Sequence, residues 1–161
     1  AEYMKKLSSE EFFEKAEPWL KKAISNPAID LRKVAALVQS RCEILSDLPE
    51  RVDFIDTLPD YEPELYIHKK SKTNLENSLE TLEALLPILQ AQEDWRNEAL
   101  YEKLVAVAAE RGVKNSVILW PLRVAVSGKA STPGGATELC ALLGKEESLA
   151  RIEKGIELLR K

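Results

Sequence analysis

The sequence predicts an all-α fold made of two small packed helical subdomains, and three observations support this prediction. Leu, Ala, Glu and Lys dominate the 161 residues, and their straight side chains lose little rotamer freedom in a helix. Apolar residues recur at helical spacing along most of the chain. No stretch alternates convincingly between apolar and polar residues, since the run 124–126 is short and lies in a helical context.

The first half of the chain predicts three helical segments. Ser8 and Glu11 have the spacing of a capping box, which predicts a helix start, and Pro18 predicts a kink or restart within that helix. A second helix is expected to begin at Asp30 and to extend to Leu45. Its apolar stripe consists of Leu31, Val34, Val38, Cys42 and Leu45. A short third helix is expected after Pro49.

The second half predicts five more helices. Residues 73–76 have the spacing of another capping box, and the helix that follows should end or bend at Pro87. Thr132 is expected to cap a short helix with Pro133 at its first position. The remaining helices are expected over 97–111, 117–127 and 145–160.

A proline-punctuated and finally basic stretch, residues 59–72, predicts the boundary between the two subdomains, which we place at 1–68 and 69–161. His68 is the only histidine and has no cysteine nearby, so we expect a surface histidine without a metal. The basic run Lys69–Lys72 is interpreted as a charged linker.

Composition limits the compartment and the partners. The net charge is −4, but residues 111–161 carry +4 and residues 1–110 therefore carry −8, so an anionic partner is expected at the C-terminal part. The two single cysteines predict buried thiols and a reducing cytoplasm. No apolar run is long enough for a membrane span, which predicts a soluble protein. A chain that opens at Ala1 without Met is expected to be a fragment of a longer protein.

Catalytic patterns are missing from the sequence. It has no supported Ser/His/Asp set, no metal cluster and no dinucleotide fingerprint, so we expect no catalytic residue, metal or cofactor. Gly128-Lys129 is not part of a phosphate-binding loop, because Arg123 stands where that motif needs glycine. What stands out is the glycine-rich stretch 121–152, whose polar turn 129–133 is suited to presenting backbone to a partner.

Several short motifs occur in a fixed order along the whole chain. They are Glu2–Ser8, Glu93–Trp95, Pro121–Ala125, Ser127-Gly128, Thr132–Gly134 and Leu142–Glu146. In these motifs the chain resembles the C-terminal anticodon-binding region of bacterial glutamyl-tRNA synthetases, which are class I aminoacyl-tRNA synthetases.

The resemblance implies an all-α anticodon-binding region that follows a Rossmann-type catalytic domain in the complete enzyme. It implies tRNA-Glu as the partner, with tRNA-Gln left open, besides the catalytic domain of the same chain, and it implies neither DNA nor a membrane. ATP with magnesium would be used by the missing catalytic domain and not by this fragment. The implied location is the bacterial cytoplasm.

The resemblance also implies site residues. Arg41 and Arg123 match arginines that contact anticodon bases in that family. Thr132, Pro133 and Gly134 match a turn that packs against and hydrogen-bonds the bases. These roles agree with RNA recognition in general, which targets unstacked loop bases by hydrogen bonds and stacking.

Other positions leave alternatives open. Many relatives have a larger apolar residue at Gly135, so only a backbone contact is expected there. The cations Lys129, Lys145 and Arg151 are candidates for phosphate contacts, and an ordinary solvated charge is the alternative for each. For Arg41 the alternative is a side chain that lies along the helix with a solvated tip. For the whole chain the alternative function is a helical protein-interaction module.

Overall fold

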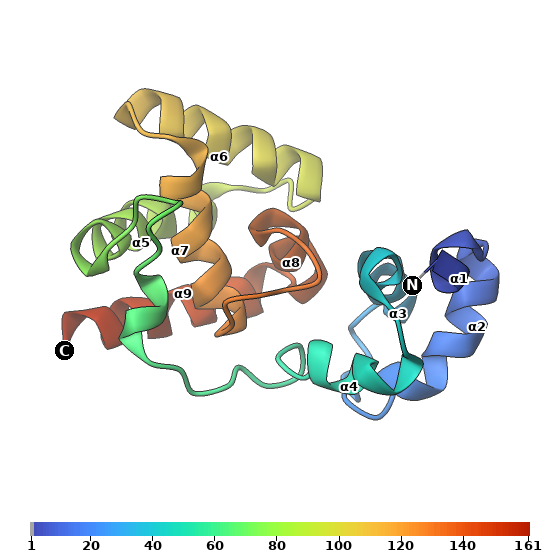
Figure 1. The fold of residues 1–161 in the computed structure, drawn as a ribbon. Helices are drawn as coiled ribbons and strands as arrows, with labels where there is room; N and C mark the ends of the chain where they lie inside the picture. The colour runs from blue at the N-terminus through green and yellow to red at the C-terminus, as the bar shows by residue number, and fades with distance from the viewer. Residues whose placement is uncertain (1) are drawn as a thin grey trace. The chain divides into compact units, whose positions relative to one another are not determined.

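Helices account for the regular secondary structure of residues 2–161, the part of the chain that the computed structural model describes (Figure 1). The α-helices within it are α1 (Glu2–Lys6), α2 (Ser9–Leu20), α3 (Leu31–Val38), α4 (Leu48–Arg51), α5 (Leu75–Ala91), α6 (Asn97–Arg111), α7 (Asn115–Ser127), α8 (Ala136–Leu143) and α9 (Lys145–Arg160). Three short 3-10 turns are η1 (Gln39–Arg41), η2 (Leu45–Asp47) and η3 (Pro63–Tyr66). The predicted all-α class is confirmed.

The described residues divide into two compact units. Unit 1 holds the chain up to Leu58 together with the short segment Ser131–Gly134, and unit 2 holds Pro59–Ala130 and Gly135–Lys161. Residues 59–68 belong to unit 2, where the Trp120 indole N–H donates to the Leu65 carbonyl at 3.1 Å. The division into functional subdomains after residue 68 stays a prediction.

In unit 1, α2 packs on α3 and α4 around a small apolar core. The Ser8–Glu11 capping box is confirmed, and the Asp30 carboxylate caps α3 by accepting from the backbone N–H groups of Arg32 and Lys33. The largest core side chains are Phe12, Leu20, Leu48 and Phe54.

The helix that was expected to run from Asp30 to Leu45 ends at Val38. Directly after it, the Gln39 side-chain amide donates to the carbonyl oxygens of Met4 and Leu7, both at 2.9 Å, and the backbone tightens into the 3-10 turn η1. Arg41 therefore lies at the end of a short turn and its side chain is exposed.

The helices neither end nor restart at their prolines, whereas the predicted kink at Pro18 and bend at Pro87 stay predictions. Pro18, Pro87 and Pro121 lie inside α2, α5 and α7, and each of these helices continues beyond its proline. A proline removes one backbone hydrogen bond from the helix. The helix ends are instead set by caps and glycines, such as the left-handed Gly112 after α6 and Gly128 after α7, which agree with the ends predicted at residues 111 and 127.

In unit 2, α7 lies among α5, α6, α8 and α9 (Figure 1). The apolar faces of these helices form the larger core, which includes Leu82, Leu89, Leu104, Leu122, Val124, Leu139 and Ile152. Gly155 lets α9 approach Tyr66, since a Cβ at this position would stand 2.6 Å from the buried tyrosine hydroxyl. None of the helices described here is long and apolar enough to cross a membrane.

The capping box before α5 differs in register from the prediction. Asn74 is the N-cap and pairs with Asn77, whereas residues 73 and 76 were predicted. Thr73 is not available as a cap, because its hydroxyl donates to the Tyr66 carbonyl at 2.8 Å and its backbone forms an isolated antiparallel bridge with His68.

Candidate functional site

Arg41 and the turn Ser131–Gly134 come together within unit 1. The Nη1 atom of Arg41 donates a 2.7 Å hydrogen bond to the carbonyl oxygen of Thr132, although 91 positions separate the two residues in the sequence. A guanidinium group has five N–H donors in a planar fork. Within the described part of the chain no other hydrogen bond of Arg41 is found. The turn therefore fixes the guanidinium while most of its donors face solvent.

Thr132 supports the turn from inside. It is 3% exposed, and its hydroxyl donates to the carbonyl oxygen of Gly134 at 2.6 Å. The prediction that it caps the next helix is wrong, because its hydroxyl is used within the turn and α8 begins only at Ala136, with Gly135 as the N-cap. Pro133 and Gly134 stay partly exposed, so the surface of the turn consists of a proline ring and backbone.

Arg123 is held by α7 and its neighbours in unit 2. Its Nη2 atom donates to the Ala130 carbonyl at 2.6 Å, and its guanidinium carbon lies 4.8 Å from the centre of the Trp120 ring. Trp120 is itself fixed by a 3.1 Å hydrogen bond from its indole N–H to the carbonyl oxygen of Leu65. A cation above an aromatic face is attracted by the ring quadrupole. Arg123 is thus oriented before any ligand arrives.

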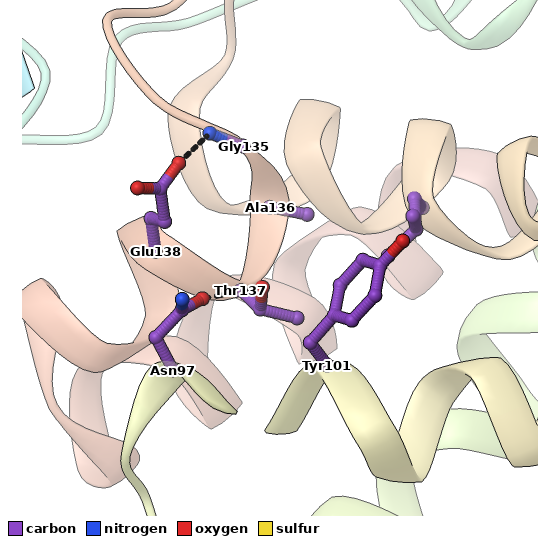
Figure 2. A pocket seen from close by; sticks show the side chains of 7 residues that line it. Asn97, Tyr101, Gly135, Ala136, Thr137 and Glu138 are labelled. Carbon is purple, nitrogen blue, oxygen red and sulfur yellow. Dashed lines mark hydrogen bonds between the residues drawn. The ribbon is translucent and has the colours of Figure 1, made fainter. Parts of the chain in front are cut away.

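A cavity of about 250 Å³ lies beside the start of α8 (Figure 2). Its lining comes from α6, α7 and the first turn of α8, namely Asn97, Tyr101, Leu119, Gly135, Ala136, Thr137 and Glu138. The side chains of Ala136 and Thr137 point toward the Tyr101 ring, which is 47% exposed (Figure 2). The cavity therefore has an aromatic wall that is open to solvent.

The polar groups of this cavity are partly engaged with one another. The Thr137 hydroxyl donates to Asn97 Oδ1 at 2.7 Å, and the backbone N–H of Gly135 donates to Glu138 Oε1 at 2.9 Å. Gly135 has no side chain with which to cap the helix, and α8 has no side-chain cap. The lining thus combines an aromatic ring with amide, carboxylate and backbone N–H groups, which suits a flat molecule with hydrogen-bonding edges.

Of the three candidate phosphate contacts, Lys145 and Arg151 have side chains that bind carbonyl groups of the protein. Lys145 Nζ donates to the carbonyl oxygens of Gln90 and Gln92, both at 2.8 Å, at the end of α5. A cation at this end of a helix is stabilised by the helix dipole. Lys129 is half-buried, and its backbone N–H donates to the Ser127 hydroxyl at 3.1 Å.

Arg151 is buried, and the structure contradicts the phosphate contact predicted for it. The residue is 1% exposed, its Nε donates to Glu147 at 2.7 Å, and its Nη1 donates to the Val126 carbonyl at 2.7 Å. The sequence showed a cation at helical spacing but not the carbonyl group 25 positions away that it binds.

Neither cysteine is an activated thiol. Burial raises the pKa of the Cys140 thiol to about 12, and it also raises the pKa of Cys42, so both thiols stay protonated at neutral pH. Across residues 2–161, the structure brings together no group of three or more His, Cys, Asp or Glu side chains that could hold a metal ion.

Comparison with known proteins identifies the family. A family model described as "Anticodon binding domain" matches residues 11–156. The chain belongs to this family of anticodon-binding domains.

Curated relatives of this anticodon-binding domain are glutamate–tRNA ligases. The chain is 48% identical to that of Clostridium tetani over 159 residues and 50% identical to that of Clostridium kluyveri over 159 residues. In both cases the match covers 99% of this chain and 32% of the relative. The chain thus spans about a third of the length of these relatives.

Two solved structures share the fold of the anticodon-binding domain. A glutamate tRNA ligase from Elizabethkingia meningosepticum, in complex with its amino acid, matches with a TM-score of 0.78 and 22% identity over 98% of this chain and 31% of that one. A glutamate–tRNA synthetase from Elizabethkingia anophelis matches with a TM-score of 0.74 and 21% identity over 97% of this chain and 30% of that one.

Sequence reasoning missed three features of this anticodon-binding domain. Tyr101 and Asn97 occupy one face of α6 at a spacing of four, but this pattern alone is common on helices. His68, predicted to be a surface histidine, is half-buried, and its ring stacks on Trp120 with centroids 3.7 Å apart, a contact that the sequence did not indicate. The Trp95 indole N–H, part of the recognised 93–95 motif, donates to the Cys140 carbonyl at 2.8 Å and secures α8.

The burial of Arg151 leads to a stability prediction for the anticodon-binding domain. Arg151→Ala should lower the free energy of unfolding by about 3 kcal/mol, because it removes a buried cation and leaves its partners without a donor. Urea unfolding followed by circular dichroism measures this change.

Arg160→Ala on the same helix is the matched control. Arg160 pairs with Glu83 where both side chains are well exposed, at 62% and 40%, so its loss should cost less than about 1 kcal/mol. Equal losses for the two variants would contradict the structural role of Arg151.

Proposed function

We propose that this anticodon-binding domain recognises the anticodon of tRNA-Glu as part of a glutamate–tRNA ligase. The complete enzyme would attach glutamate to tRNA with ATP and magnesium, in the bacterial cytoplasm, through a catalytic domain that is not among these 161 residues. The similarity to glutamate–tRNA ligases supports the substrate. The observation that supports the site best is the Arg41–Thr132 hydrogen bond, which joins two segments that, according to the family resemblance, contact anticodon bases.

Arg41 would read a base edge with the donors that Thr132 leaves unused. Two parallel N–H groups of a guanidinium match two acceptors on one base edge, and such bidentate pairs discriminate strongly between bases. Because the Thr132 carbonyl holds Nη1, the fork is restrained before RNA binds and less side-chain entropy is lost.

The turn Ser131–Gly134 would offer a different kind of contact to the bases. The Pro133 ring presents an apolar face to an unstacked base, and the exposed backbone at Gly134 presents polar groups. Arg123, restrained by Trp120 and the Ala130 carbonyl, is the second candidate for a base contact. Of the two predicted functional subdomains, 1–68 would supply Arg41 and 69–161 the other contacts.

The cavity beside α8 would accept an unpaired base against Tyr101. Its amide and carboxylate groups, from Asn97 and Glu138, are the types that pair with the polar edges of bases. Gly135 directly follows the predicted turn in the chain and lines the cavity. Because glycine has no side chain, this position leaves the cavity open.

Binding of an RNA stem-loop tests the proposal. The chain should bind a stem-loop with the glutamate anticodon more tightly than one with the same stem and a scrambled loop, as measured by fluorescence anisotropy at fixed salt. Equal affinity for the two loops would overturn the proposal and would favour a protein-interaction module instead.

Loss of either predicted arginine contact should reduce this discrimination. Arg41→Ala and Arg123→Ala are each expected to lower the preference for the glutamate anticodon by about 1–3 kcal/mol, which is roughly 5- to 150-fold in relative affinity. Thermal melts of both variants should show that the free energy of unfolding falls by less than this loss of discrimination.

Arg41→Lys separates the two roles of the guanidinium. A lysine ammonium keeps a donor for the Thr132 carbonyl but has no planar fork, so stability should recover while discrimination does not. Full recovery of discrimination in Arg41→Lys would show that Arg41 contributes only charge or support.

Tyr101 tests the cavity. Tyr101→Ala should weaken stem-loop binding by about 1–3 kcal/mol through loss of a stacked base, whereas Tyr101→Phe keeps the ring and should bind like the wild type. Since the side chain is about half exposed, the fold should tolerate both changes. Unchanged affinity of Tyr101→Ala would exclude the cavity from the RNA site.

A further inference from the structure

The segment His68–Thr73, here named the basic turn, is a closed structure at the start of α7. Two backbone hydrogen bonds close it, from His68 N–H to the Thr73 carbonyl at 3.2 Å and from Thr73 N–H to the His68 carbonyl at 3.1 Å. The Ser116 hydroxyl, in the first turn of α7, donates to the Ser71 carbonyl at 3.3 Å. The interpretation of this segment as a charged linker is therefore wrong.

Further contacts restrain the basic turn. The His68 ring stacks on Trp120 at an angle of 9°, and its Nδ1 is hydrogen-bonded to the Ser71 hydroxyl at 2.8 Å. Lys72 adopts a φ of 59°, which non-glycine residues rarely do, and its carbonyl accepts a 3.0 Å hydrogen bond from the Asn77 side chain. A lysine in this conformation indicates that the surrounding contacts determine the shape of the turn.

The turn concentrates positive charge that takes part in no salt bridge within the described residues. Lys69, Lys70 and Lys72 are exposed, as is Lys114, which lies two residues before Ser116. In residues 2–161, none of the salt bridges or side-chain hydrogen bonds involves the ammonium group of these four lysines. They form an uncompensated basic patch in a chain whose net charge is −4.

We propose that the basic turn and Lys114 bind the phosphate backbone of the same RNA whose base Arg123 contacts. This inference rests on the proposed function and adds the source of its phosphate contacts. It is favoured because Lys145 and Arg151, two cations predicted for that task, bind carbonyl groups of the protein instead. Compact ammonium groups on a fixed turn suit phosphate oxygens.

The face of α7 connects the two kinds of contact. Ser116 holds the basic turn, Trp120 stacks on its histidine, and Arg123 lies against Trp120, so the three side chains share one face of the helix. From Lys114 to Arg123 the helix rises by about 14 Å, which is about four stacked nucleotides of one strand. A strand that follows this face meets the base-reading arginine and the basic turn together.

Salt dependence measures phosphate contacts directly. Each contact contributes about 0.7 to 0.9 to the slope of log affinity against log salt concentration. In the stem-loop assay, Lys69→Gln/Lys70→Gln should make the slope shallower by about 1.4 to 1.8 and weaken binding several-fold at low salt. The preference for the glutamate loop should remain. Lys114→Gln should remove about one further contact.

Lys103→Gln/Lys154→Gln is the matched control, because it removes the same charge from exposed positions elsewhere in unit 2. Its slope should stay within the error of the wild type. Lys72 is left unchanged because of its backbone conformation, and melting curves confirm that each variant is folded.

Three outcomes would overturn the inference. The first is an unchanged salt slope in Lys69→Gln/Lys70→Gln, and the second is an equal change of slope in the control pair. The third is that polyglutamate binds the wild type as tightly as the stem-loop does and that Lys69→Gln/Lys70→Gln abolishes this binding. Failure of the wild type to distinguish the two loops would instead overturn the proposed function.

Discussion

The hydrogen bond from Arg41 to the Thr132 carbonyl is the interaction on which the candidate site depends. It attaches the four residues Ser131–Gly134 to a unit otherwise formed by the chain up to Leu58. Its acceptor is a backbone oxygen of a turn that a second hydrogen bond, from the Thr132 hydroxyl, already closes. The arginine is thus positioned by the turn and not by a helix of its own, because α3 ends before it is reached.

Local signals explain which parts of the fold could be predicted. The bounds of α6 and α9 and the caps at Ser8 and Asp30 depend on residues within one helical turn, and these were predicted correctly. Thr73 and Thr132 stand where the sequence predicts an N-cap. Their hydroxyls instead donate to carbonyl groups and do not cap the following helix. Whether a threonine caps a helix depends on which backbone group binds its hydroxyl, and the local sequence does not show which carbonyl groups compete for it.

The same limit applies to the site. Resemblance to a family carried over Arg41, Arg123 and the turn residue by residue, but it could not show that Arg41 meets Thr132. The cavity at Tyr101 requires α6 and α8 to be neighbours, and the stacking of His68 on Trp120 requires the basic turn to reach α7. Such features arise from packing between segments that lie far apart in the chain, so local periodicity and residue spacing cannot predict them.

The distribution of charge would allow a domain with a net negative charge to bind a polyanion, as the proposed function requires. Charged groups that bind carbonyl groups, as Arg151 and Lys145 do, stabilise the fold but offer little to a ligand, because their donors are occupied. Among the described residues, the ammonium groups of the basic turn make no such hydrogen bond, and they stay exposed to solvent. Residues 1–110 carry a net charge of −8 although the basic turn lies among them, so its exposed lysines contrast with an otherwise acidic part of the chain. In the proposed complex, repulsion elsewhere would favour the placement that brings the RNA backbone to these lysines and a base to Arg123.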